Sequence, residues 1–222
     1  DVETAMEILR HLGCRADWQG RDLLVDAADL TRWDVPDHLM SRMRSSVVFL
    51  GAILARCGQA EMTYPGGCEL GARPIDLHIR AFQALGAQVR SWNGRLSFYG
   101  PRLHGRRLAL PIPSVGATEN AMLAACGAQG ITVIDNPARE PEIVDLQGFL
   151  RSMGAQVSGA GTGEITIQGG CRLHAGEYTV MADRIVAATY LCAVAAAGGE
   201  GELLGTQGED LGPVLAALEA AG

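Results

Sequence analysis

A repeat of about seventy residues limits the folds open to this chain more than any other feature of its sequence. Four predicted helices end at Gly13, Gly86, Gly154 and Gly222, and these glycines are 73, 68 and 68 residues apart. Helices commonly end at glycine because glycine adopts the left-handed conformation without steric strain. The spacing predicts copies of one structural unit, which is too long for an ordinary solenoid repeat.

The segments between these glycines predict that each unit combines helices with a β-hairpin. Two short strands around a glycine-containing turn are expected over residues 15–25, 88–98 and 156–167. Asn93-Gly94 between alternating apolar residues is a strong hairpin signal. Further strands are expected at 60–64, 107–111, 131–135 and 202–205. The chain is therefore predicted to be α/β, built from helix–strand–helix–hairpin units.

Both ends of the chain fall inside a unit. Residue 1 opens on a helix without the strand that precedes it in later copies, and Gly222 ends a helix that earlier copies follow with a hairpin. We therefore expect the sequence to be an excerpt of a longer protein, truncated at both ends.

Composition excludes several classes of function. The net charge of −7 gives no basic surface for nucleic acid, and no apolar run reaches the roughly 18 residues of a membrane span. All 18 basic residues are arginines, which suit phosphate and carboxylate ligands, so this chain cannot complete a mechanism that needs a lysine. Six scattered cysteines fit a reducing cytoplasm better than a disulfide framework. The histidines form no metal pattern, and we expect no cofactor.

Cys68 is the candidate for chemistry. It lies between Gly66-Gly67 and Gly71, where the backbone is expected to leave the sulfur accessible. Arg73 and a helix predicted to open at Pro74 would both favour the thiolate. A reactive cysteine is one interpretation; a glycine-rich turn that happens to hold an inert thiol is the other, because most free cysteines are unreactive.

Three other segments resemble the starts of ligand-facing helices. Residues 113–120 place Ser114 as a helix cap with Gly116 behind it, so unpaired backbone N–H groups would face outward and suit a phosphate. An ordinary capped helix explains the same residues. Residues 138–145 carry a proline near a helix start with acids in the first turn, and residues 41–46 place two arginines before a helix. Helix stability and solvated arginines are the simpler explanations of these two segments.

Three motifs together resemble the UDP-N-acetylglucosamine enolpyruvyl transferase family: PGGCELGARPIDLH at 65–78, PSVGATENAMLAA at 113–125 and NPAREPEIVDLQGFL at 136–150. The resemblance implies a fold of two lobes built from six βαβαββ-like units. It also implies transfer of the enolpyruvyl group of phosphoenolpyruvate to the 3′-hydroxyl of UDP-N-acetylglucosamine with release of phosphate, the first committed step of peptidoglycan synthesis. Such an enzyme serves cell wall biogenesis, cell shape and cell division in the cytoplasm.

The resemblance assigns roles to residues. Cys68 matches the loop cysteine, which donates a proton, forms an adduct with phosphoenolpyruvate and is the target of fosfomycin. Arg73 would also approach the phosphate of phosphoenolpyruvate. The positions that match substrate-binding residues are Arg44, Arg73, Pro74, Ile75, Asp76, Leu77, Ile112, Pro113, Ser114, Val115, Gly116 and Glu140. Some members carry lysine where this chain has Ile112, so a contact made by that side chain would be missing.

The resemblance also predicts a division of the chain, with residues 1–181 in the first lobe and 182–222 at the start of the second. The remainder of its own second lobe would be its partner. A lysine and an asparagine of the family would precede Asp1, and an aspartate and an arginine would follow Gly222. We therefore expect this chain alone to be inactive, because closure of a cleft between the lobes brings the catalytic groups together.

Alternatives stay open. The shikimate-pathway enolpyruvyl transferase shares the fold but lacks the cysteine loop, so Cys68 argues against it. A non-catalytic relative that binds sugar nucleotides is a second alternative. A thiol redox sensor is a third, and it would show a low thiol pKa and sensitivity to peroxide without affinity for a sugar nucleotide.

Overall fold

The chain forms two units in a computed structural model, which describes residues 1–64 and 74–221. The first unit comprises Asp1–Gly176 and the second Glu177–Gly222. The lobe boundary expected at residue 181 stays a prediction. Among the described residues, no helix is both long enough and apolar enough to cross a membrane.

The predicted repeat is present in the first unit as three helices that end in the same way. The helices α1 (Val2–His11), α4 (Asp76–Ala84) and α6 (Pro141–Ser152) are each followed, two residues after the last helical residue, by a left-handed glycine. The next amide then donates to the carbonyl five residues earlier, as Cys14 does to Leu9 at 2.9 Å. This Schellman ending satisfies carbonyls at the helix end and turns the chain into the following strand.

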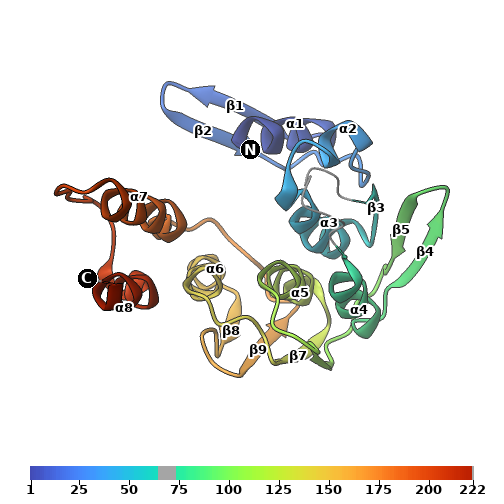
Figure 1. Ribbon diagram of the computed structural model, residues 1–222. Helices are drawn as coiled ribbons and strands as arrows, with labels where there is room; N and C mark the ends of the chain where they lie inside the picture. The colour runs from blue at the N-terminus through green and yellow to red at the C-terminus, as the bar shows by residue number, and fades with distance from the viewer. Residues whose placement is uncertain (65–73, 222) are drawn as a thin grey trace. The chain divides into compact units, whose positions relative to one another are not determined.

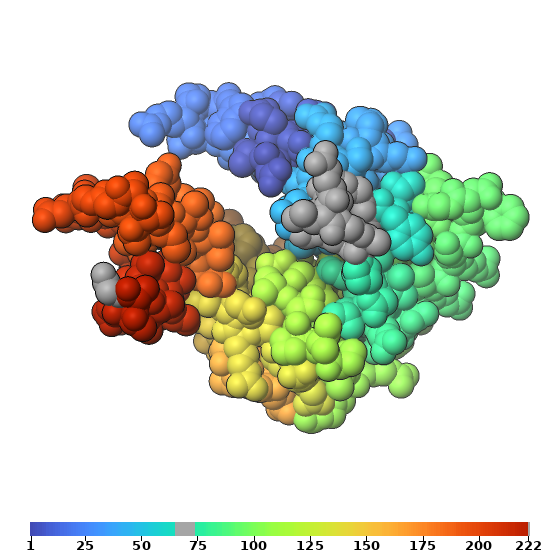
Figure 2. All heavy atoms as spheres, in the orientation of Figure 1, coloured from blue at the N-terminus to red at the C-terminus, as the bar shows by residue number. Residues whose placement is uncertain are grey.

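The three predicted hairpins follow these endings. They are β1 (Arg15–Gln19) with β2 (Asp22–Asp26), β4 (Gln88–Trp92) with β5 (Arg95–Tyr99), and β8 (Gln156–Ser158) with β9 (Glu164–Gly169), all antiparallel. Asn93 and Gly94 both have positive φ, as the Asn-Gly signal predicts. The β4–β5 hairpin extends beyond the helices of the unit (Figures 1 and 2), and Trp92 near its tip is 78% exposed.

The remaining helices and strands of the first unit include the strands that complete two larger sheets. The elements are α2 (Asp37–Met40), the 3₁₀ helix η1 (Arg44–Val48), α3 (Phe49–Cys57), β3 (Gln59–Thr63), β6 (Arg107–Ala109), α5 (Val115–Gly127) and β7 (Gly130–Asp135). One sheet has the order β3-β5-β4, and the other has the order β6-β7-β9-β8 with only β6 and β7 parallel. The α/β architecture is confirmed.

Helix α5 lies at the centre of the core, in contact with α3 and α4 (Figure 1). Ala117, Ala121, Ala124 and Ala125 of α5 are all fully buried. These four alanines lie on one face of α5, because their spacing is three or four residues, and their small side chains let neighbouring helices approach closely. Helix α5 therefore fixes how the surrounding helices are placed.

Two sequence expectations are wrong. Residues 202–205 form no strand; they are irregular and end in a turn, and the described part of the second unit holds only α7 (Arg184–Ala197), the 3₁₀ helix η2 (Gly208–Leu211) and α8 (Gly212–Ala221). A strand must pair its backbone groups with another strand, and residues 177–221 provide none. The helix expected to open at Pro74 begins instead at Asp76, with Ile75 as its cap.

Candidate functional site

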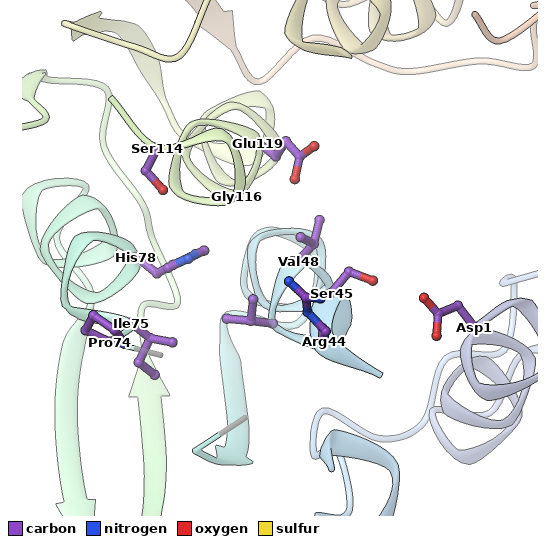
Figure 3. A pocket seen from close by; sticks show the side chains of 11 residues that line it. Asp1, Arg44, Ser45, Val48, Pro74, Ile75, His78, Ser114, Gly116 and Glu119 are labelled. Carbon is purple, nitrogen blue, oxygen red and sulfur yellow. The ribbon is translucent and has the colours of Figure 1, made fainter. Parts of the chain in front are cut away.

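The starts of four helical segments, α1, η1, α4 and α5, surround a pocket of about 570 Å³ in the first unit (Figure 3). Its lining residues are Asp1, Arg44, Ser45, Val47, Val48, Pro74, Ile75, His78, Ser114, Gly116 and Glu119. Helix N-termini carry unpaired N–H groups and the positive end of the helix dipole, so their convergence favours an anionic occupant.

Helix α5 supplies one wall of the pocket through its first turns. Ser114 is the helix cap, and its hydroxyl oxygen accepts a hydrogen bond from the Ala117 amide at 3.4 Å, as the sequence predicts. A Cβ atom added to Gly116 would lie 3.3 Å from Cε1 of His78. The absence of a side chain at Gly116 therefore lets the His78 ring of α4 lie against the backbone of α5.

Arg44 contributes a cation to the pocket. It is the first residue of η1 and is exposed, and Figure 3 shows its side chain on the α3 side of the pocket. A cation at a helix start is unfavourable unless an anion or solvent compensates it. The Ser114 cap and the Arg44 guanidinium both line the pocket and are both favourable partners for an anion.

His78 projects from α4 toward the start of α5 (Figure 3) and is only 7% exposed. Its Nδ1 lies 2.8 Å from Nδ2 of Asn120, a fully buried residue of α5. Burial lowers the pKa of His78 to about 4, although the charge of Asp76 acts in the opposite direction. His78 is therefore neutral near pH 7.

Asn120 links the helices that build this wall. Its Oδ1 accepts a hydrogen bond from the Gly51 amide at 2.7 Å, and its Nδ2 donates to the Val47 carbonyl at 2.9 Å. These are the two backbone groups, four residues apart, that a continuous α-helix would pair with each other. The Asn120 amide thus bridges η1 and α3 at their junction while it also contacts His78 of α4.

Glu119 places a carboxyl group on the same pocket. Burial raises its pKa, and the nearby charge of Glu142 raises it further. Figure 3 shows the Glu119 carboxyl on the opposite side of α5 from Ser114. The pocket therefore combines phosphate-binding donors at one end with a carboxyl of raised pKa at the other.

The structure brings together only part of the predicted site. Arg44, Pro74, Ile75, Ser114 and Gly116 line the pocket. Cys68 and Arg73 lie outside the described residues. The pocket lining leaves out Asp76, Leu77, Ile112, Pro113, Val115 and Glu140.

Three of the residues that do not line the pocket lie in different surroundings. Leu77 is 9% exposed and belongs to the hydrophobic core, whereas Ile112 is 62% exposed on the loop before α5. Glu140 is the cap residue of α6 and precedes a proline at the first helical position, as expected for that segment. Their proposed contacts with substrate therefore stay predictions.

Sequence reasoning missed His78 and Asn120 as residues of the site. The sequence analysis gives His78 no role beyond its place in the motif at 65–78, and Asn120 none beyond its place in the motif at 113–125. An asparagine inside an apolar helix was the available signal, because buried amides need partners. The described residues contain no group of three or more His, Cys, Asp or Glu side chains that could hold a metal ion.

The chain is similar to enolpyruvyl transferases over its whole length. A family model described as EPSP synthase (3-phosphoshikimate 1-carboxyvinyltransferase) matches residues 1–219. A UDP-N-acetylglucosamine 1-carboxyvinyltransferase 2 of Caldanaerobacter subterraneus subsp. tengcongensis is 49% identical over 100% of this chain and 53% of that relative. A UDP-N-acetylglucosamine 1-carboxyvinyltransferase of Gluconacetobacter diazotrophicus is 44% identical, over 100% of this chain and 54% of that relative. The chain thus spans about half the length of the curated relatives it matches.

Solved structures show the same architecture. The enolpyruvyl transferase NikO from Streptomyces tendae has a TM-score of 0.73 at 27% identity, covering 86% of this chain and 47% of that chain. An EPSP synthase from Acinetobacter baumannii has a TM-score of 0.64 at 22% identity, covering 87% of this chain and 44% of that chain. The second likeness shows the fold alone.

Proposed function

Because the chain belongs to the EPSP synthase family of enolpyruvyl transferases, we propose that it provides the part of a transferase that binds UDP-N-acetylglucosamine and carries the reactive cysteine. The family resemblance inferred from the three sequence motifs is confirmed. The observation that carries the proposal is the pocket where Arg44, Ser114 and the start of α5 converge, because it offers donors for a nucleotide diphosphate.

In the proposed reaction, the 3′-hydroxyl of the sugar gives up its proton to a base as its oxygen attacks C2 of phosphoenolpyruvate, and C3 takes a proton. Loss of phosphate from C2 and of a proton from C3 then restores the double bond, which leaves an enol ether on the sugar. Cys68 would supply the proton, and Arg73 would hold the phosphate that leaves. The product would enter peptidoglycan synthesis.

The free cysteines support a reducing compartment. The described residues include five cysteines, all of them free thiols: Cys14, Cys57, Cys126, Cys171 and Cys192. Disulfides are rare in the cytosol because its thiol buffers keep cysteines reduced. We therefore assign the protein to the cytoplasm within this proposal.

Isothermal titration of the chain with UDP-N-acetylglucosamine tests the binding role. We expect binding by the unaltered chain and about tenfold weaker binding by Arg44→Gln, because one charge-assisted contact to phosphate is lost. Arg102→Gln removes an exposed arginine that is not part of the pocket and serves as the matched control. Absence of binding, or equal affinities of the two variants, would contradict the proposal.

Three further measurements separate the alternative functions. Preferential binding of shikimate 3-phosphate would favour the EPSP synthase reaction instead. Labelling by fosfomycin, located by peptide mass spectrometry, should occur at Cys68 and disappear in Cys68→Ser. Peroxide oxidation of Cys68 without affinity for UDP-N-acetylglucosamine or shikimate 3-phosphate would favour a redox sensor.

A further inference from the structure

The contacts of Asn120 fix the orientation of its side-chain amide without reference to His78. A backbone N–H can only donate, so the atom facing Gly51 N must be the amide oxygen. A carbonyl oxygen can only accept, so the atom facing Val47 O must be the amide nitrogen. Two backbone partners therefore exclude the flipped amide.

The same orientation fixes which nitrogen of His78 carries the proton. Nδ2 of Asn120 has two hydrogens, of which one is bound to Val47 O and the other points to Nδ1 of His78 at 2.8 Å. Nδ1 must then accept, so the proton of the neutral ring resides on Nε2. Among the described residues, Nε2 has no hydrogen-bond partner.

This unpaired donor belongs to a side chain that is more than nine-tenths buried and lines the pocket. The ring extends from α4 toward the first turn of α5 (Figure 3), and a Cβ atom at Gly116 would lie 3.6 Å from Nε2. The other charged groups on the pocket are Arg44, Asp1 and Glu119, while Asp76 lies on the same helix as His78. The start of α5 thus carries two kinds of donor, its backbone N–H groups and the Nε2–H of His78.

We propose that Asn120 is a positioning residue that holds His78 in the Nε2–H tautomer, so that the neutral ring donates a hydrogen bond to a phosphate oxygen of the ligand bound at the start of α5. The identity of this ligand as a nucleotide diphosphate rests on the proposed function, whereas the tautomer rests on the hydrogen bonds alone. A buried neutral donor avoids the desolvation cost that a buried imidazolium would carry.

An aspartate at position 120 would reverse the polarity of the contact. A carboxylate cannot donate to Nδ1, so it would accept from an Nδ1–H, and the neutral ring would then present a lone pair on Nε2 to the pocket. A lone pair repels a phosphate oxygen where a proton attracts it. Asn136 provides a matched control because it too donates to a backbone carbonyl, that of Leu110 at 2.9 Å, and is not part of the pocket.

The direct test is a ¹⁵N–¹H long-range correlation spectrum of the histidine rings in the unaltered chain at neutral pH, with His78→Gln assigning the signals. We expect a protonated Nε2 and an unprotonated Nδ1 on His78. This measurement needs no ligand to bind. A protonated Nδ1 with a bare Nε2 would overturn the proposal.

The second test titrates UDP-N-acetylglucosamine into the unaltered chain, Asn120→Asp and Asn136→Asp. We expect the Nε2–H signal of the unaltered chain to shift on binding, Asn120→Asp to move the proton to Nδ1, and its affinity to fall about tenfold. Asn136→Asp should change neither. Unchanged ring signals and affinity in Asn120→Asp would refute the positioning role, because a purely structural asparagine would not control the tautomer.

The two proposals fail in different ways. Binding of UDP-N-acetylglucosamine by a chain whose His78 is protonated on Nδ1 would leave the proposed function standing and reject the role of Asn120. An Nε2–H tautomer in a chain that does not bind UDP-N-acetylglucosamine would support the positioning role and reject the proposed ligand.

Discussion

Substitution of Gly51 by alanine should destabilise the first unit, although alanine is the better helix former. Gly51 lies in α3 where this helix crosses α5, and its amide donates to Oδ1 of Asn120. A Cβ atom at this position would lie 2.5 Å from the backbone oxygen of Asn120 and 2.8 Å from Oδ1, where ordinary contacts begin at 3.4 Å. The nearest of these atoms belongs to a buried helix backbone, so the two helices would have to separate by about 1 Å.

Three contributions set the size of the effect. Overpacking a close-packed core costs about 1–3 kcal/mol, and leaving the buried Gly51 amide without its acceptor costs about 1–3 kcal/mol more. Alanine returns about 1 kcal/mol through its higher helix propensity. We expect a net loss of about 3 kcal/mol in the free energy of unfolding.

Urea denaturation followed by tryptophan fluorescence is a suitable assay, because Trp18, Trp33 and Trp92 all belong to the first unit. The neighbouring residue Ala52 is exposed, so Ala52→Gly measures the propensity contribution in the same helix without a steric one, at about 1 kcal/mol. If Gly51→Ala unfolds at the same urea concentration as the unaltered chain or at a higher one, the argument from helix contact is refuted.

Substitutions at two further positions test buried polar groups. Thr132 of β7 is fully buried, and its hydroxyl has no hydrogen-bond partner among the described residues. Thr132→Val should therefore raise the free energy of unfolding by about 1 kcal/mol, whereas Thr132→Ser should lower it; a loss of stability in the valine variant would contradict this. Because the pKa of His78 is lowered to about 4, the unfolded chain takes up a proton first as the pH falls. The free energy of unfolding is therefore unaffected by protonation of His78 above about pH 6.5. It falls as the pH is lowered from there toward 4, by up to about 3 kcal/mol. His78→Gln should remove this pH dependence of stability in urea titrations at several pH values. The raised pKa of Glu119 has the opposite effect on the pH dependence, but it is present in both proteins. If the free energies of unfolding of the two proteins change with pH in parallel, the prediction is contradicted.

Local signals predicted the repeating part of the fold. Gly13, Gly86 and Gly154 mark helix endings because the left-handed conformation is a property of one residue and its neighbours in sequence. Asn93-Gly94 sets a hairpin for the same reason. The strand expected at 202–205 failed because a strand depends on a partner, which a pattern within four residues does not reveal.

The site, too, could be predicted only where its signals lie within a few neighbouring residues. The cap at Ser114 is local and was correctly predicted, whereas the contact between His78 and Asn120 joins residues 42 positions apart. Two of the Asn120 partners are backbone groups, at Val47 and Gly51, and a backbone amide or carbonyl leaves no signature in the sequence. The need for glycine at position 51 is likewise not local, because it comes from the close approach of α5 to α3 at this point.

The bridge made by Asn120 has a thermodynamic consequence for recognition. Side chains that must be ordered on binding each reduce affinity by about 0.5–1.5 kcal/mol. The His78 ring is already immobilised by burial and by its bond to Asn120, which is itself secured at two backbone groups. The entropy cost of ordering this ring therefore belongs to folding and not to binding. A ligand that forms a hydrogen bond with the ring binds more tightly for that reason.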